Sequence, residues 1–239
     1  SDWALPDILN YRALYFAYQS PDSLADYYKV ERWSKAHWNL IEKSLAMLGR
    51  GGNAGLIIPM TAESSYGNAE SLVRWIRRKD GGWKYDFSLF DRYLDLALKY
   101  HHLGRLKFVV LHVWGLEVTG ADPAGAKISV FDRASGKLTL MTLPPYGTNE
   151  CEDLWRPVLI AACKRLSDRG LGESLLFGSS DDRLPSPAHA GMFNNILPGT
   201  PWYHASHGGA NSIYVDPTDR TKKVPIRCSA VSPLRAKAA

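Results

Sequence analysis

The chain has 239 residues, of which 45% are apolar and 11% are aromatic. This length and composition suffice to bury the core of one large domain or two small ones, and they exclude a disordered chain and a collagen-like fibre. The longest apolar runs, around Gly55–Pro59 and Phe108–Trp114, have the length of strands. They are too short to form a membrane-spanning helix, so we expect no membrane partner.

The net charge of +5 is concentrated at the carboxyl end of the sequence. Residues 216–239 contain six basic and two acidic side chains, so residues 1–215 carry only about +1. This distribution favours a basic tail or linker over a nucleic-acid-binding surface. We therefore expect one folded domain over residues 1–215, a tail over residues 216–239 and no nucleic-acid partner.

The three cysteines, Cys151, Cys163 and Cys228, are too few and too scattered for a disulfide framework or a paired-cysteine metal site. The sequence also lacks the Gly-rich loop after a first strand that binds dinucleotides, since Gly49–Gly52 follows a predicted helix. We expect no cofactor and no metal. Ser1 is not preceded by a basic and apolar leader, so we expect any signal peptide to have been removed or to lie outside this sequence.

The first half of the chain alternates apolar runs with amphipathic segments. Ala13–Tyr18 predicts a first strand, and Gly55–Met60 predicts a second. Between them, apolar residues recur at three and four positions along Lys35–Leu48, which predicts a helix that Ser34 caps. A second helix is predicted from Asp86 to the stop at Gly104, because Phe87, Phe90, Leu94 and Leu98 share one face.

A third strand is predicted over Leu106–Trp114, apolar on both faces as in a parallel sheet covered by helices. Two alternating segments, Lys127–Phe131 and Lys137–Met141, predict a hairpin inserted after it. The remaining predicted elements are a helix over Glu152–Arg169, a fourth strand over Glu173–Gly178, a short helix over Ala188–Ile196, a fifth strand over Pro201–Ser206 and a weaker sixth over Ser212–Val215. No further strand or helix is expected after Val215.

Repeated strand–helix units of this length indicate an α/β fold, and a TIM-barrel-like (β/α)8 architecture is the leading interpretation. Only five or six of the eight strands are found, so the barrel is predicted to be partial. An open α/β sheet is the alternative. A partial barrel has an exposed edge, which we expect a missing segment or a second copy of the chain to cover.

In a barrel, the active site lies at the carboxyl ends of the strands, so the residues that follow each strand are the site candidates. These are Gln19, Thr61, Glu63, Trp114, Glu117, Ser179, Ser180, Asp181, Asp182, Tyr203, His204 and His207. The set is rich in carboxylates and aromatic rings. Aromatic faces stack on a pyranose ring, and paired carboxylates cleave its glycosidic linkage. A carbohydrate substrate is therefore the leading hypothesis.

Asp181 and Asp182 are the strongest catalytic candidates, although an Asp pair after a strand also caps the following helix. If both carboxylates enter one pocket, their like charges raise one pKa, as a general acid requires. Trp114 and Trp202 fit either sugar platforms or core positions. Glu117 fits a second acid or a plain loop residue. His204 and His207 would need Asp181 to hold a metal, and no HExxH motif supports one.

Four aromatic and acidic signatures resemble the catalytic barrel of glycoside hydrolase family 123 and its relatives. They are Trp33–Trp38 before a helix, Lys84–Asp95 before the third strand, Trp155-Arg156-Pro157, and Leu175–Gly178 followed by acids and a proline. The resemblance covers roughly Ala13–His207.

The resemblance implies a retaining N-acetylhexosaminidase that works by substrate assistance. Asp181 would orient the 2-acetamido group of the sugar, and Asp182 would act as the acid/base. Asp182 stands where the family has Glu, and Arg183-Leu184 separates it from Pro185 where the family's proline follows directly. The substrate-binding set comes from the strand ends and not from the resemblance: Trp114, Glu117, Trp202, Tyr203, His204 and His207.

Members of this family are longer and carry β-sandwich regions, and they are typically exported by glycan-degrading bacteria. The resemblance therefore implies a periplasmic or extracellular location. Two hypotheses follow: a glycosidase that hydrolyses O-glycosyl bonds, and a non-catalytic glycan-binding or scaffold module on the same fold. The second follows from the absent Glu and the absent strands. A metal-dependent hydrolase is a third, separate class.

Overall fold

A computed structural model of the chain describes residues 7, 10, 14–17, 19–101, 106–116, 123–179, 182–205 and 210–229. Its helices are α1 (Pro21–Tyr28), α2 (Lys35–Arg50), α3 (Ser88–Tyr100), α4 (Asn149–Ser167) and α5 (Pro187–Ile196), with a 3-10 turn at Gly172–Ser174. Its strands are β1 (Gly55–Pro59), β2 (Arg74–Arg77), β3 (Trp83–Asp86), β4 (Phe108–His112), β5 (Gly125–Asp132), β6 (Lys137–Pro145), β7 (Leu175–Ser179), β8 (Trp202–His204), β9 (Ser212–Tyr214) and β10 (Lys223–Ser229).

The central element is a six-stranded sheet in the order β1-β4-β7-β8-β10-β9. All neighbours are parallel except β9, which pairs antiparallel with β10. The register aligns Ile57 with Val110, and Val110 with Leu176. The third, fourth and fifth predicted strands are therefore neighbours in space, in chain order.

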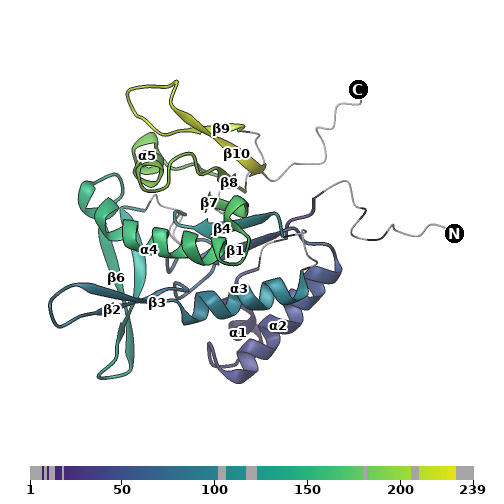
Figure 1. The fold of residues 1–239 in the computed structure, drawn as a ribbon. Helices are drawn as coiled ribbons and strands as arrows, with labels where there is room; N and C mark the ends of the chain where they lie inside the picture. The colour runs from purple at the N-terminus through teal and green to yellow at the C-terminus, as the bar shows by residue number, and fades with distance from the viewer. Residues whose placement is uncertain are drawn as a thin grey trace.

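The helices lie on one face of this sheet, and a four-stranded sheet, β3-β2-β5-β6, extends away from it (Figure 1). On the helix-covered face, strand residues such as Leu56, Leu111 and Phe177 pack with apolar residues of α2, α3, α4 and α5 in one core. Ser34, Thr148 and Ser186 begin α2, α4 and α5, because each hydroxyl accepts a hydrogen bond from an amide of the first turn.

The opposite face of the sheet carries a smaller apolar cluster made of Ile57, Tyr66, Val110, Leu176 and Tyr203. The strands approach closely here. A Cβ at position 178 would lie 2.1 Å from a methyl carbon of Val110, which explains why β7 has Gly178 at this point.

The structure does not confirm the partial TIM-barrel interpretation and agrees with the open-sheet alternative. The sheet is open, with β1 and β9 at its edges, so a closed (β/α)8 TIM barrel is not what the described residues form. The predicted first strand is described only at residues 14–17 of Ala13–Tyr18. There Tyr15 makes one isolated parallel bridge to Asn53, beside the amino end of β1. None of the described helices is long and apolar enough to cross a membrane.

The structure also contains helices and strands that the apolar pattern of the sequence did not predict. Strand β10 lies within residues 216–239, where a tail without strands was expected, and pairs with both β8 and β9. β2 and β3 join the predicted hairpin, now β5 and β6, to make the second sheet. α1 was not predicted either. The four predicted helices and the strands β1, β4, β7, β8 and β9 are confirmed, with ends shifted by a few residues.

The contribution of core packing to stability can be tested at Trp202. Its side chain is 1% exposed and packs against the rings of Phe177 and Phe193, at centroid distances of 5.7 and 5.9 Å. We expect Trp202→Ala to lower the free energy of unfolding by about 3–5 kcal/mol, because it empties a large buried volume. Chemical denaturation checks this value. Trp83→Ala, at a partly exposed ring in β3, is the control and should cost clearly less. Equal losses would contradict the assignment of Trp202 to the core.

Candidate functional site

The site is built at the carboxyl edge of the six-stranded sheet. Because β1, β4, β7 and β8 run parallel, the segments that follow them emerge at the same edge. Among the described residues these segments begin at Met60, Val113, Asp182 and Ala205. Side chains far apart in the sequence therefore meet here.

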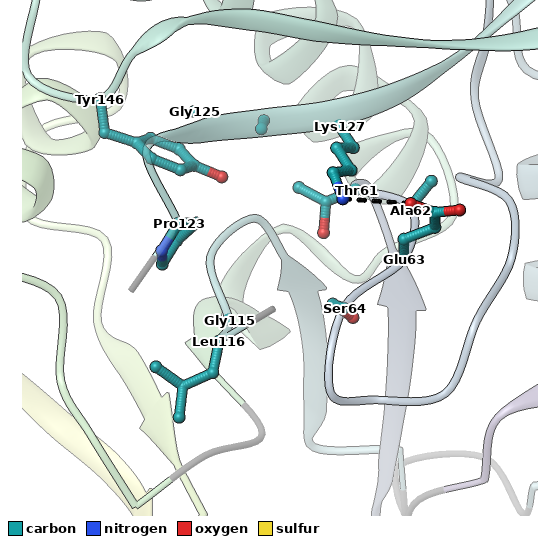
Figure 2. A pocket seen from close by; sticks show the side chains of 11 residues that line it. Thr61, Ala62, Glu63, Ser64, Gly115, Leu116, Pro123, Gly125, Lys127 and Tyr146 are labelled. Atoms are coloured by element: carbon teal, nitrogen blue, oxygen red, sulfur yellow. Dashed lines mark hydrogen bonds and ion pairs between the residues drawn. The ribbon is translucent and has the colours of Figure 1, made fainter. Parts of the chain in front are cut away.

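A shallow hollow opens where β1 and β4 end, and its free space of about 260 Å³ includes open solvent (Figure 2). Strand β5 and the residue after β6 close its other side. It is lined by Thr61, Ala62, Glu63, Ser64, Gly115, Leu116, Pro123, Gly125, Ala126, Lys127 and Tyr146.

The polar groups of the hollow come from both sides. The ammonium of Lys127 on β5 lies 3.1 Å from a carboxylate oxygen of Glu63, and both side chains are partly exposed (Figure 2). Thr61 is 4% exposed, and its buried hydroxyl oxygen has no hydrogen-bond partner among the described residues. A buried hydroxyl without a partner is energetically costly.

Tyr146 forms an aromatic wall of the hollow. Its hydroxyl donates a hydrogen bond of 2.8 Å to the carbonyl of Val113, at the end of β4. Burial raises the pKa of Tyr146 well above its ordinary value, so the phenol stays protonated and keeps this bond. This hydrogen bond holds the Tyr146 ring in place against the end of β4.

The segment from Thr61 to Glu70 has a defined shape because its own side chains bind its backbone. The buried amide of Asn68 donates to the carbonyls of Thr61 and Glu70, at 2.6 and 3.0 Å, and accepts from the hydroxyl of Ser64 at 2.7 Å. Glu63 adopts a left-handed backbone conformation, with φ of 49°. These bonds hold that conformation, which non-glycine residues seldom adopt.

Helix α1 anchors the same segment from outside. The buried carboxylate of Asp22 accepts the amide of Ala69 at 2.6 Å, and the hydroxyl of Ser20 donates to the carbonyl of Gly67 at 3.1 Å. Asp22 is also 3.4 Å from Arg32. Burial raises the pKa of Asp22 above its ordinary value, and the bond from Ala69 and the charge of Arg32 oppose this shift. The site's shape thus depends on a buried acid.

At the end of β7, Asp182 is exposed, and its backbone carbonyl lies 3.0 Å from Nε2 of His204 on β8. A carbonyl can only accept, so Nε2 carries the proton. Nδ1 of His204 is buried without a hydrogen-bond partner in the described part of the chain. His204 therefore holds the backbone of the Asp182 turn.

Most of the other predicted site residues do not contribute to this hollow. Glu117, Ser180, Asp181 and His207 lie outside the described residues. Trp114 and Trp202, at 2% and 1% exposed, both belong to the main core, so the structure favours the core alternative over the sugar platform for each. Tyr203 points to the opposite face of the sheet, where its ring lies 5.0 Å from that of Phe16. Neither tryptophan offers a free face for stacking.

Three polar residues of the hollow were not singled out from the sequence: Ser64, Lys127 and Tyr146. Ser64 stands five positions after β1, Lys127 lies on the second sheet and Tyr146 follows that sheet's last strand, so the strand-end rule for the main sheet does not reach them. Among the described residues, no three His, Cys, Asp or Glu side chains come close enough to hold a metal ion.

The comparison with protein families agrees with this geometry. Residues 18–233 match the model of the glycoside hydrolase 123 catalytic domain. The chain belongs to this family. Its signatures at Trp33–Trp38, Lys84–Asp95 and Leu175–Gly178 lie within the matched region.

Among solved structures, the chain is similar to a family 123 glycoside hydrolase from Clostridium perfringens, whose description concerns glycolipid glycan hydrolysis. The TM-score is 0.59 and the sequence identity is 19%, over 79% of this chain. The match spans 34% of the other chain, so the family 123 fold is shared over about a third of that protein. No curated protein matches the chain significantly.

The anchoring role of Asp22 is tested against Asp26, which pairs with the same arginine but is exposed. We expect Asp22→Ala to cost about 1–3 kcal/mol of unfolding free energy, because the amide of Ala69 loses its acceptor. Asp26→Ala should cost only ~0–1 kcal/mol, the value of an exposed ion pair. Chemical denaturation of both variants measures the difference. Equal small losses would show that α1 does not hold the loop.

The raised pKa of Asp22 also predicts a pH dependence. The folded state holds the proton of the Asp22 carboxyl more tightly than the unfolded state does. The contribution of Asp22 to stability is therefore fully present below pH 3.8, the ordinary pKa, and falls as the pH rises through the folded pKa. Asp22→Asn lacks this titration. We expect the stability of the unmodified chain relative to Asp22→Asn to decrease between about pH 3 and pH 7. A difference that is constant or increases with pH would contradict the burial of an ionised carboxylate.

Proposed function

We propose that this chain is the catalytic part of a glycoside hydrolase that cleaves the glycosidic bond of an N-acetylhexosamine with retention of configuration. Membership of family 123 supports the reaction class. The observation that carries the proposal is the hollow at the carboxyl edge of the sheet, the same edge at which the segment bearing Asp182 leaves β7. Family enzymes of this reaction class need a sugar pocket and an acid at one edge.

In the proposed reaction, Asp182 gives a proton to the leaving oxygen as the bond to the anomeric carbon breaks. The carbonyl oxygen of the sugar's 2-acetamido group forms a bond to that carbon, and the carboxylate of Asp181 orients the acetamide and stabilises its positive charge. Water then attacks the anomeric carbon, gives its proton to Asp182 and restores the acetamide. Two displacements at one carbon retain the configuration.

The residues of the hollow have binding roles in this proposal. The Glu63 and Lys127 pair, which is accessible to solvent, offers an acceptor and a donor to ring hydroxyls. His204 keeps the Asp182 turn in place through its bond to the backbone. The enzyme thus needs no metal or cofactor in this proposal.

A non-catalytic glycan-binding module is the second candidate function. The observation that favours it is Asp182 itself, which is one methylene shorter than the Glu of the family pattern. A shorter acid sits farther from a leaving oxygen held in the same pocket. Binding would then persist without turnover.

The proposal extends to partners and location. We propose that the exposed edges of the sheet, at β1 and β9, are covered by further parts of a longer protein or by a second copy. We also propose a periplasmic or extracellular location in a glycan-degrading bacterium, from the resemblance to exported family members.

Turnover of chromogenic N-acetylhexosaminides tests the proposed function. We expect Asp182→Asn to lower kcat at least ~100-fold, because a positioned acid/base contributes about that much or more. Asp182→Glu, which restores the family residue, should retain or raise activity. Asp153→Asn, at an exposed position on α4, is the control and should change nothing.

The outcomes separate the two candidate functions. Sugar binding without turnover, in both the unmodified chain and Asp182→Glu, would support the binding module. Undiminished turnover in Asp182→Asn would remove Asp182 from the acid/base role. Neither binding nor turnover with any N-acetylhexosaminide would contradict both candidates.

A further inference from the structure

One end of the second sheet carries a concentration of positive charge that the proposed reaction does not use. Strand β2 pairs in parallel with β5, so the turn after β2 and the turn after β5 lie at the same end of this sheet. That end projects from the helices and the main sheet (Figure 1). We call residues 77–84 and 132–137 together the basic tip.

The basic tip has a net charge of +4, from six cations and two acids. The six cations are all exposed, and they are Arg77, Arg78, Lys79, Lys84, Arg133 and Lys137. Residues 1–215 carry about +1 in total, so the part of them outside the tip carries about −3. The folded domain therefore has one strongly positive end, and this asymmetry orients it toward an anionic partner.

The two acids of the tip leave most of its positive charge uncompensated. Asp80 pairs with Arg78 at 3.3 Å. Asp132 accepts hydrogen bonds from the amide of Ala134 and the hydroxyl of Ser135, at 2.9 and 2.7 Å. Within the described ranges of the chain, none of the other five cations forms an ion pair. Their charges are therefore available to an external anionic group.

An aromatic ring accompanies these charges. The guanidinium of Arg77 lies over the ring of Trp83, 4.5 Å from its centroid, and Trp83 is partly exposed. Trp83 also meets the buried ring of Trp75 edge to face at 5.5 Å, which holds it in place. Tryptophan beside basic side chains is the combination that suits the boundary between lipid headgroups and water.

The shape of the tip favours an extended partner over a small anion. Gly81 and Gly136 stand in the two turns with φ of 85° and 68°, and a Cβ built at either would meet none of the described atoms within 4 Å. Both turns are therefore tight and open to the outside. Because they project from one end of the sheet, a flat anionic surface can contact both turns at once.

Strand β5 connects the basic tip to the hollow at the carboxyl edge of the main sheet. Lys127, near the start of β5, lines the hollow, and Asp132 ends the strand at the tip. Five residues of extended strand span roughly 17 Å. A surface that holds the tip therefore lies near the hollow.

We propose that the basic tip docks on the surface of a bilayer that contains anionic lipids. Its cations neutralise lipid phosphates, and Trp83 lies at the level of the headgroups. This contact replaces the expectation of no membrane partner, which followed from the lack of a membrane-spanning helix and did not concern surface binding. The proposal does not rest on the proposed function, because docking is measured without turnover.

Vesicle co-sedimentation of the full chain tests the proposal. The probes are vesicles of phosphatidylcholine alone and of phosphatidylcholine with one third phosphatidylglycerol. We expect binding to the anionic vesicles only, and weaker binding as the salt concentration is raised. The fourfold variant Lys79→Gln/Lys84→Gln/Arg133→Gln/Lys137→Gln should lower the affinity at least about 50-fold, because each basic side chain near an anionic bilayer strengthens binding about fivefold.

The matched control removes the same charge elsewhere. Lys35→Gln/Lys43→Gln/Arg50→Gln/Lys107→Gln changes four exposed cations that form no ion pair in the part of the chain that the structure describes. This control should stay clearly closer to the unmodified chain than the fourfold tip variant does. If the tip variant fails to fold, Lys79→Gln/Arg133→Gln changes only turn residues and should still lose at least about tenfold in affinity.

Four results would overturn the docking proposal. They are equal binding of the unmodified chain to both kinds of vesicle, no binding to anionic vesicles, equal losses in the tip variant and its control, and an unchanged affinity in Lys79→Gln/Arg133→Gln. Binding of heparin or duplex DNA through the same four side chains, without binding to vesicles, would also overturn it, since the tip would then serve another class of polyanion. The proposed function stands or falls separately, by turnover.

Discussion

The parallel pairing of β1, β4, β7 and β8 is the constraint on which the site depends. In a parallel sheet, every strand ends at the same edge, so the segments after Pro59, His112 and Ser179 must meet, although more than fifty residues separate each from the next. The apolar contacts of Ile57, Val110 and Leu176 on one face, and of the helices on the other, fix this register. The chemistry of the edge then follows from which side chains the sequence places just after each strand.

The edge is shaped by polar groups that are themselves buried. Asp22, Asn68 and Thr61 are almost inaccessible to water, and each is costly to bury unless hydrogen-bonded. Asp22 and Asn68 use their bonds to hold the segment after β1, whereas the Thr61 hydroxyl faces the hollow without a partner among the described residues. The hydrogen bonds of Asn68 and Asp22 are therefore the ones that shape the edge, and they also hold the left-handed conformation of Glu63.

Much of the fold could be predicted because burial leaves a pattern. Buried strands such as β1 and β4 are continuous apolar runs, and α2 and α4 combine an apolar face with a capping hydroxyl. β10 has no such pattern, since Lys223, Pro225 and Arg227 interrupt it and its pairing with β8 is a tertiary effect. The α/β class with a parallel sheet is confirmed, but the partial barrel is not, because the way a sheet ends or closes depends on edge pairings that local periodicity does not describe.

The candidate site could be predicted only in part. The strand-end rule found Thr61, Glu63 and Asp182, but the sequence left Trp114 and Trp202 undecided because an apolar ring suits a core and a sugar equally. Burial decided for the core. The same rule does not reach Lys127 and Tyr146, which belong to the inserted second sheet and the residue after it. The basic tip likewise becomes visible only when the parallel pairing of β2 with β5 is known, since its two turns are far apart in the sequence.

The most direct test of the account is to locate a bound sugar at the carboxyl edge of the sheet. Backbone amide NMR spectra, recorded while an N-acetylhexosamine methyl glycoside is added, would report which residues sense it. The account predicts shifts concentrated at Thr61–Ser64, at Gly115 and Leu116, and around Asp182. Shifts confined to the amino ends of the strands, near Asn53 and Lys107, would contradict it, because the sugar would then bind at the wrong edge of the sheet.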